Sequence, residues 1–261
     1  QVVFNGELFD FREKRKQLEA KGHQFRTSTD TELLPHLWEE YGENLFEHLK
    51  GQFAFCLWDA KQNSLLLARD RFGICPLYWT IQQRGDTRFL LFASEIKALF
   101  ASGYVNPEAD LRGLNHVFTF FAVPGPLTCF RGINLLLPGH SLKVQLGTGT
   151  ITERTYWEID FPDEGQELNP PESVAVAEYE RLFIQSVSRR LQADVPVVAY
   201  LSGGVDSSVV AAIASKVLGR PIPTFTVAVR SRGYDESPEA ALVAKHIGSQ
   251  SVVADYHDAD V

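Results

Sequence analysis

The segment Leu201-Ser202-Gly203-Gly204-Val205-Asp206-Ser207-Ser208 joins a short apolar run to a helical stretch. Two adjacent glycines let the backbone approach a ligand closely, and successive N–H groups at the start of the helix form a positive pocket that suits phosphate. Three serine hydroxyls supply further donors. The carboxylate of Asp206 fits a phosphate pocket only with a divalent cation between the two negative groups, so Asp206 is a candidate Mg²⁺ ligand.

This segment differs from the common phosphate-binding loop because it lacks the lysine of the GxxxxGK[ST] pattern. An alternative interpretation is a capped tight turn, in which Asp206 and the serines are ordinary capping residues. The eight-residue match between a strand and a helix favours phosphate binding, and it resembles the SGGxDSS loop of the ATP pyrophosphatase group. Residues 201–208 are therefore predicted to hold the pyrophosphate part of ATP.

The sequence on both sides of this loop alternates between helical and strand-like stretches. Helices are predicted over 174–191, 208–218 and 237–247, and buried strands over 196–201, 222–229 and 252–256. This alternation predicts a parallel sheet in a doubly wound, Rossmann-like domain. Because ligands of such sheets bind beyond the carboxyl ends of the strands, Leu201 and Val227 could sandwich an adenine, although both also fit as plain core residues.

The first half of the chain has a different pattern. Short runs rich in Phe, Leu, Trp and Tyr alternate with turn residues, which predicts antiparallel strands over 53–58, 64–68, 77–81, 89–93 and 141–146. Helices are predicted over 9–21, 31–41 and 94–101, and a loop over 118–131. The polar, Pro-containing stretch 158–173 is the predicted linker between the halves.

Composition argues against several classes of function. The chain has 33 acidic and 25 basic residues, whereas nucleic acid needs a clustered basic surface. Nucleic acid is therefore not an expected partner. No run of about 18 apolar residues occurs, so a membrane is not an expected partner either, and a cytoplasmic location is expected. The three cysteines form no CxxC pair, and Cys56 fits a buried inert thiol. The seven histidines form no HxxxH or HxH pair, which argues against metal ligation by His.

Several motifs in the first half resemble one family in their order and spacing. They are Asn5-Gly6-Glu7, Asp30-Thr31-Glu32, Gly51-Gln52-Phe53-Ala54-Phe55, the stretch 68–78 and the stretch 92–99. Together with the loop at 201–208, they closely resemble the glutamine-hydrolysing asparagine synthetases. The resemblance implies an N-terminal-nucleophile αββα domain, a class II glutamine amidotransferase, over 1–157. It also implies a PP-loop ATP-binding domain over 174–261, with both domains incomplete and the chain truncated at both ends.

In this family the catalytic nucleophile is a first-residue cysteine whose own α-amino group acts as the base. None of the cysteines here is at the start of the chain, so the expected nucleophile is absent from it. The resemblance implies that the Asn5 side-chain amide and the Gly6 N–H form the oxyanion hole. It also implies that Asn5, Gly6, Glu7 and Asp30 bind glutamine, with Asp30 holding the α-ammonium group.

The same residues also have simpler interpretations. Asn5-Gly6 is a common tight-turn pair. The stretch 29–32 scans as a helix capping box, with Thr29 as the cap and Glu32 at the third helical position. The mixed charges of 69–71 and of Glu95 and Lys97 are best interpreted as structural ion pairs.

The family resemblance implies two coupled reactions. Glutamine hydrolysis releases ammonia in the first domain, and ATP with Mg²⁺ activates the side-chain carboxylate of aspartate in the second. Ammonia then displaces AMP, so the products are asparagine, glutamate, AMP and pyrophosphate. Glutamine, aspartate and ATP are the expected partners, a homodimer is left open, and the chain by itself is expected to be inactive. The alternatives are a relative that amidates or cyclises another carboxylate acceptor, and a nucleotide-binding pseudoenzyme.

Overall fold

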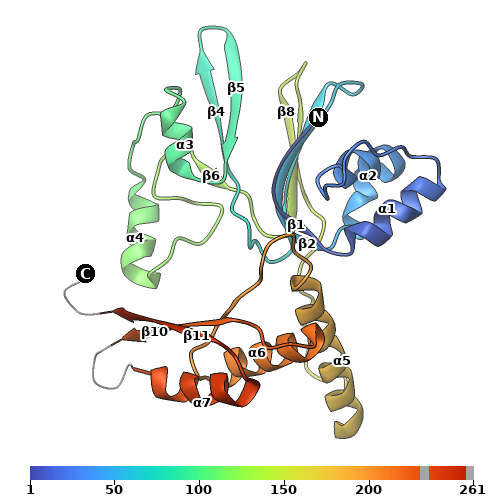
Figure 1. Ribbon diagram of the computed structural model, residues 1–261. Helices are drawn as coiled ribbons and strands as arrows, with labels where there is room; N and C mark the ends of the chain where they lie inside the picture. The colour runs from blue at the N-terminus through green and yellow to red at the C-terminus, as the bar shows by residue number, and fades with distance from the viewer. Residues whose placement is uncertain (230–234, 257–261) are drawn as a thin grey trace. The chain divides into compact units, whose positions relative to one another are not determined.

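The computed structural model describes residues 1–229 and 235–256. The chain divides into two compact units, Gln1–Pro162 and Asp163–Val261 (Figure 1). Between the last strand of the first unit and the first helix of the second, residues 156–171 form neither helix nor strand. The predicted domain boundaries at 157 and 174 stay a prediction. Within the described part of the chain, no helix is long and apolar enough to cross a lipid bilayer.

The first unit contains two antiparallel sheets, with strand orders β1-β2-β3-β7-β8 and β5-β4-β6. The strands are β1 (Val2–Leu8), β2 (Gly51–Asp59), β3 (Ser64–Arg69), β4 (Tyr78–Arg84), β5 (Thr87–Ala93), β6 (Asn134–Leu135), β7 (His140–Gln145) and β8 (Thr150–Thr155). The helices are α1 (Phe11–Ala20), α2 (Leu33–Tyr41), the 3-10 helix η1 (Gly42–Glu47), α3 (Ile96–Ala101) and α4 (Leu111–Phe120). The predicted antiparallel strands are confirmed to within a few residues.

Helices cover the outer faces of both sheets, so the first unit has four layers (Figure 1). Side chains along β2 alternate between two cores, because successive residues of a strand point to opposite faces. Phe53 and Phe55 pack in the cluster that α1 and α2 cover, whereas Ala54 and Cys56 pack between the two sheets. Beyond the smaller sheet, Leu99 of α3 anchors a third cluster. The expected αββα sandwich is confirmed. Burial between the two sheets raises the pKa of the Cys56 thiol to about 12, which agrees with the prediction of an inert thiol.

The charged segment 69–71 anchors the backbone instead of forming ion pairs. The carboxylate of Asp70 is 1% exposed and accepts hydrogen bonds of 3.0–3.2 Å from the N–H groups of Phe53, Phe72, Ile74 and Cys75. Arg69 donates to the carbonyl oxygens of Cys75, Leu136 and Gly73, and Arg71 to those of Leu49 and Phe46. The ion-pair hypothesis is wrong for this segment, since none of the three side chains forms a salt bridge with a described residue. Lys97 and Glu95 do pair, at 2.5 Å.

Helix α4 lies partly where a loop was predicted, over 118–131. Asp110 begins the helix, and its side chain accepts a hydrogen bond of 2.9 Å from the N–H of Arg112. Gly113 lets the helix lie against the neighbouring segment, because a Cβ there would be 2.1 Å from the carbonyl oxygen of Thr128. The loop prediction is therefore wrong for residues 118–120 and agrees with the structure further along the chain.

The second unit is built on a parallel sheet of three described strands, in the order β11-β10-β9. The strands are β9 (Ala199–Tyr200), β10 (Thr224–Val229) and β11 (Ser251–Tyr256), and the helices are α5 (Glu172–Arg190), α6 (Val205–Leu218) and α7 (Ser237–Ile247). The predicted parallel sheet is confirmed. Because the strands follow one another in chain order and such crossovers are right-handed, α6 and α7 cover the same face. The doubly wound arrangement is therefore not seen in residues 163–229 and 235–256.

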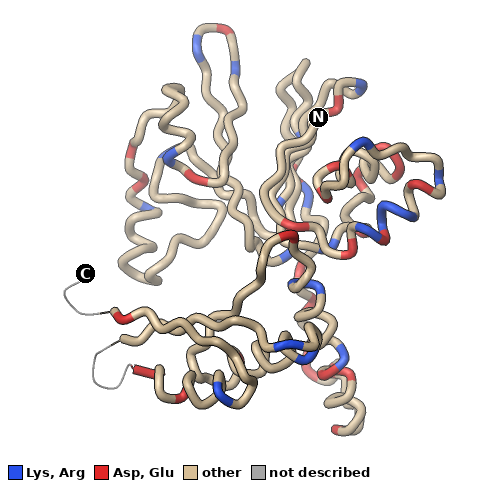
Figure 2. The backbone as a smooth tube through the Cα atoms, in the orientation of Figure 1, with Lys and Arg blue, Asp and Glu red and all other residues tan. Residues whose placement is uncertain are grey.

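The face of this sheet away from α6 and α7 exposes apolar side chains. Along β10, Thr224, Thr226 and Ala228 are buried, whereas Phe225 and Val227 are 37% and 53% exposed. Neither β9 nor β10 carries a charged residue, and Figure 2 draws β10 in tan. Within the described part of this unit, β10 thus has one packed face and one apolar face open to water, whereas every residue of β11 is exposed.

The Asp70 network can be tested by mutation. Asp70→Ala leaves two buried and two partly buried backbone N–H groups without their acceptor, so the free energy of unfolding of the first unit should fall by roughly 4 kcal/mol. All four Trp residues lie within 1–162, so urea unfolding followed by Trp fluorescence reports on this unit alone. Asp86→Ala removes an exposed carboxylate from the β4–β5 turn and serves as the matched control. A loss below about 1 kcal/mol for Asp70→Ala would contradict the anchoring role.

Candidate functional site

The pairing of β1 with β2 positions the predicted oxyanion-hole residues. Asn5 lies opposite Ala54, and Gly6 lies opposite Phe53. Gly6 has φ of 145°, and a Cβ there would be 2.1 Å from the carbonyl oxygen of Gln52. Only glycine fits such a close approach of two backbones. Asn5-Gly6 is therefore part of a strand, and the tight-turn alternative is wrong.

The side-chain amide of Asn5 is held by a residue to which the sequence assigned no role. Asn5 Nδ2 donates a hydrogen bond of 3.2 Å to Ser94 Oγ, in the short link between β5 and α3. The contact joins the larger sheet to the end of the smaller one, so both sheets define the direction of the amide. The signal was present in the motif Phe92-Ala93-Ser94-Glu95, but a hydroxyl has no distinctive spacing that would mark it.

Asp30 is brought next to the strand that carries the other predicted glutamine-binding residues. Its Oδ2 accepts a hydrogen bond of 2.9 Å from the N–H of Leu8, which directly follows Glu7 in β1. Its Oδ1 accepts a longer one, of 3.4 Å, from the hydroxyl of Thr31. The structure thus gathers Asn5, Gly6, Glu7 and Asp30 around the second half of one strand.

The capping-box alternative for 29–32 is wrong. Helix α2 begins at Leu33, and its N-cap, Glu32, makes no side-chain cap hydrogen bond. Glu32 instead accepts from the N–H of Arg26 and from the N–H and hydroxyl of Thr27, at 2.6–2.7 Å. The hydroxyl of Thr27 and the N–H of Arg26 are the main reasons that the pKa of Glu32 falls to about 2. Glu32 therefore stays ionised and orders the segment that leads to Asp30.

In the second unit, hydroxyl groups hold the predicted phosphate loop in shape. Ser207 Oγ lies 3.0 Å from Ser202 Oγ and accepts a hydrogen bond from the N–H of Ser202. Ser208 Oγ donates to the carbonyl oxygen of Gly204 at 2.7 Å. Helix α6 begins at Val205, so the first-turn N–H groups after Gly204 have no partner within the helix and are available to an anion.

Close packing fixes Gly203 of the loop relative to α7. Gly203 has φ of 84°, and a Cβ there would lie 2.6 Å from the backbone nitrogen of Ala240, in the first turn of α7. The loop is thus pressed against a second helix, and a side chain at this position would displace it. The carboxylate of Asp206 is exposed in the first turn of α6 and, among the residues that the structure describes, makes no hydrogen bond or ion pair.

The side chains of Leu201 and Val227 lie on opposite faces of the sheet. Leu201 is 1% exposed and packs under the helices with Ala211 and Ala240. Its N–H donates to the carbonyl oxygen of Phe225, and its own carbonyl accepts from Thr226 Oγ1 at 2.8 Å. Val227 lies on the opposite, open face of the sheet. The predicted adenine contacts stay a prediction, and the contribution of Leu201 that the structure shows is to anchor the loop.

Comparison with known proteins fits this geometry. The sequence model of the glutamine amidotransferase domain matches residues 1–157, and that of asparagine synthase matches residues 178–261. Asparagine synthetase [glutamine-hydrolyzing] 3 of Bacillus subtilis is 39% identical over 87% of this chain and 36% of its own length. Amidase chyE of Penicillium rubens is 36% identical over 95% of this chain and 37% of its own length. The chain therefore spans little more than a third of these two relatives.

Among solved structures, the glutamine phosphoribosylpyrophosphate amidotransferase from B. subtilis, complexed with ADP and GMP, is 17% identical. It covers 97% of this chain and 60% of that one with a TM-score of 0.41, a likeness too low to bear on function.

The chain belongs to the glutamine amidotransferase domain family. Because the asparagine synthase model follows in the same chain, it has the domain pair of the glutamine-hydrolysing asparagine synthetases.

The close approach at Gly6 predicts a specific intolerance. Gly6→Ala forces a Cβ against Gln52, so the free energy of unfolding of the first unit should fall by at least about 2 kcal/mol more than in Gly85→Ala. Gly85 also has positive φ, of 57°, but nothing lies within 4 Å of its added Cβ. The two variants therefore separate steric contact from backbone strain in the same Trp-monitored urea experiment. Equal losses would refute the steric account.

Proposed function

We propose that this chain forms the glutamine-holding and ATP-holding parts of a glutamine-dependent asparagine synthetase. The observation that carries the proposal is the loop at 202–208. It combines the free amides of a helix N-terminus, two mutually bonded serines, a third serine bonded to the Gly204 carbonyl oxygen, and one exposed carboxylate. This is the combination expected of a site for a nucleotide pyrophosphate with a bridging cation.

In the proposed first reaction, glutamine lies beside the second half of β1. Asn5 Nδ2, oriented by Ser94, and the N–H of Gly6 would donate to the oxygen of the carboxamide as negative charge develops on it. Glu7 and Asp30 would hold the amino-acid end of glutamine, with the Asp30 carboxylate on the α-ammonium group. The nucleophile would be a first-residue cysteine of the whole protein, as in the family, so the chain by itself is proposed to release no ammonia.

In the proposed second reaction, ATP lies beyond the carboxyl ends of β9 and β10. The N–H groups of 205–207 and the hydroxyl groups of Ser202, Ser207 and Ser208 would bind its phosphates, with Leu201 holding the start of the loop. Val227 would contact the nucleotide only from the open face of the sheet. The adenylated carboxylate is proposed to be that of aspartate, with ammonia from glutamine as the second substrate.

Magnesium fits the residues present. The cation would be held by the exposed carboxylate of Asp206, which lies in the first turn of α6 beside the phosphate-binding amides. Mg²⁺ is typically bound through one or two carboxylates together with substrate phosphates. When bound, it would neutralise phosphate charge, and without it Asp206 would repel the same phosphates.

A second candidate is the same chemistry on a different carboxylate acceptor. The similarity to Amidase chyE, at 36% identity, is close to that of the asparagine synthetase relative. Assaying the whole protein with glutamine and ATP for amidation of aspartate against other carboxylic acids separates the two candidates. Formation of asparagine supports the first, and turnover of only another acid supports the second.

Nucleotide binding tests the site directly. Calorimetric titration of the chain with a non-hydrolysable α,β-methylene analogue of ATP should show tighter binding with Mg²⁺ than with EDTA. Asp206→Ala should weaken binding in Mg²⁺ by about tenfold, or ~1.4 kcal/mol, and should abolish the advantage of Mg²⁺ over EDTA.

Two glycine variants control for loop shape. Gly203→Ala should also weaken binding, because its Cβ meets the backbone of α7. Gly219→Ala should leave binding unchanged, since Gly219 has a similar φ of 65° and nothing lies within 4 Å of its added Cβ. An unchanged Mg²⁺ dependence in Asp206→Ala would overturn the proposed cation site.

A further inference from the structure

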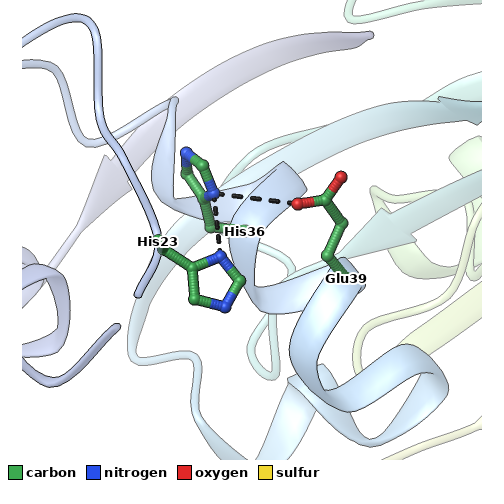
Figure 3. Close-up of side chains that lie close together, drawn as sticks. All are labelled: His23, His36 and Glu39. Atoms are coloured by element: carbon green, nitrogen blue, oxygen red, sulfur yellow. Dashed lines mark hydrogen bonds and ion pairs between the residues drawn. The ribbon is translucent and has the colours of Figure 1, made fainter. Parts of the chain in front are cut away.

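Two histidines of the first unit lie face to edge beside a cluster of carboxylates. His23 follows α1 and His36 lies in α2, so no short motif links them in the sequence. Their Nδ1 atoms are 3.1 Å apart, and an oxygen of Glu39 lies 3.9 Å from His36 Nδ1. One ligand atom from each of the three residues falls within 4.8 Å of the other two (Figure 3).

We propose that His23, His36 and Glu39 bind a divalent transition-metal ion of the zinc type. A zinc ion with bonds of about 2.0–2.1 Å to two imidazole nitrogens holds those nitrogens about 3.3 Å apart in tetrahedral geometry. The observed Nδ1 separation of 3.1 Å therefore needs little movement of either ring. The absence of a sequence motif argued against a histidine metal site, and the fold supplies the pairing that the sequence does not show.

Proton positions favour an ion between the two rings. His23 Nε2 lies 3.1 Å from an oxygen of Glu40, and His36 Nε2 lies 3.8 Å from an oxygen of Glu32. A proton on each Nε2 therefore faces a carboxylate, which leaves an unprotonated Nδ1 on each ring, and these two atoms are 3.1 Å apart. Without an ion, one Nδ1 must carry the proton between the rings. If His36 Nδ1 carries that proton and the His36 ring is neutral, the lone pair on His36 Nε2 faces the carboxylate of Glu32.

The carboxylates that face the rings have the arrangement of outer-shell partners. Metal-binding histidines commonly donate their other ring N–H to a carboxylate, which sets the tautomer and the ring orientation. Glu40 is itself held by Lys21 at 2.7 Å, and Glu32 accepts hydrogen bonds from Thr27 and Arg26. Three carboxylates against one lysine leave an excess of negative charge around the rings.

The rings are also held in place before any ion binds. The Phe25 ring packs on His36 at 4.2 Å between centroids, and the two imidazoles meet at 85°. The side chains of His23 and His36 are only 14% and 16% exposed, whereas that of Glu39 is 60% exposed. Two packed imidazole nitrogens and one exposed carboxylate leave a coordination position for water. Imidazole ligands favour Zn²⁺, Co²⁺ or Ni²⁺ over Mg²⁺, which prefers oxygen.

Cobalt provides the test, because Co²⁺ absorbs visible light in sites of this kind and Zn²⁺ displaces it. Titration of the full chain with Co²⁺ at neutral pH should reach its endpoint near one equivalent, and added Zn²⁺ should remove the absorbance. His23→Ala and His36→Ala should each lower Co²⁺ affinity by about 100-fold, and Glu39→Gln by roughly tenfold. His246→Ala, which removes an exposed imidazole from α7 in the second unit, is the matched control and should bind normally.

Folding of each variant is checked by Trp fluorescence of the first unit, and a second readout uses the unaltered chain. Zn²⁺ at 100 times its dissociation constant should raise the thermal midpoint of the first unit and leave that of the His36→Ala variant unchanged. Equal Co²⁺ affinity in the unaltered chain, His36→Ala and His246→Ala would overturn the proposal. So would the absence of any Co²⁺ absorbance in the unaltered chain.

Discussion

The buried carboxylate of Asp70 is the interaction on which the first unit depends. Phe53 donates its N–H to Asp70 Oδ2, and its carbonyl accepts from the N–H of Asp70, so the two backbones are joined twice. Phe53 lies opposite Gly6. A turn that lies well away from β1 in the sequence therefore sets the position of the strand that carries Asn5 and Gly6. A charged acceptor suits this task because its hydrogen bonds are stronger than those of a neutral one.

Much of the fold was predictable because apolar periodicity reports directly on strands and helices. The run from Phe53 to Trp58 and the alternation after residue 196 both led to elements that the structure contains. Helix α4 was missed because the Pro-Gly-Pro cluster at 124–126 dominated the interpretation, although Asp110 was present as a cap signal. The doubly wound arrangement is not seen in the described residues for a different reason. Alternating strands and helices predict parallel pairing, but the order of the strands in the sheet decides which face each helix covers. Strand order has no local signal in the sequence.

The candidate sites were also predictable from the sequence only in part. The loop after Leu201 was recognisable because its function needs adjacent glycines, serines and an acid in one short stretch. Asp30 was assigned through family resemblance, since its local pattern imitates a capping box while its partner, Leu8, is far away in sequence. Leu201 and Val227 were paired by strand position alone, and the side-chain parity of β10 separates them. His23 and His36 were dismissed because metal motifs are recognised by short spacing, which these two residues lack.

The open face of the three-stranded sheet has a practical consequence for handling the second unit. Phe225 and Val227 present aromatic and aliphatic groups to water on strands that lack charged gatekeepers. Sulfate and phosphate strengthen apolar burial, so concentrated buffers of these salts favour precipitation through this surface. Crystallisation trials or concentrated NMR samples of this unit would therefore do best with mild denaturant or a chaotropic anion.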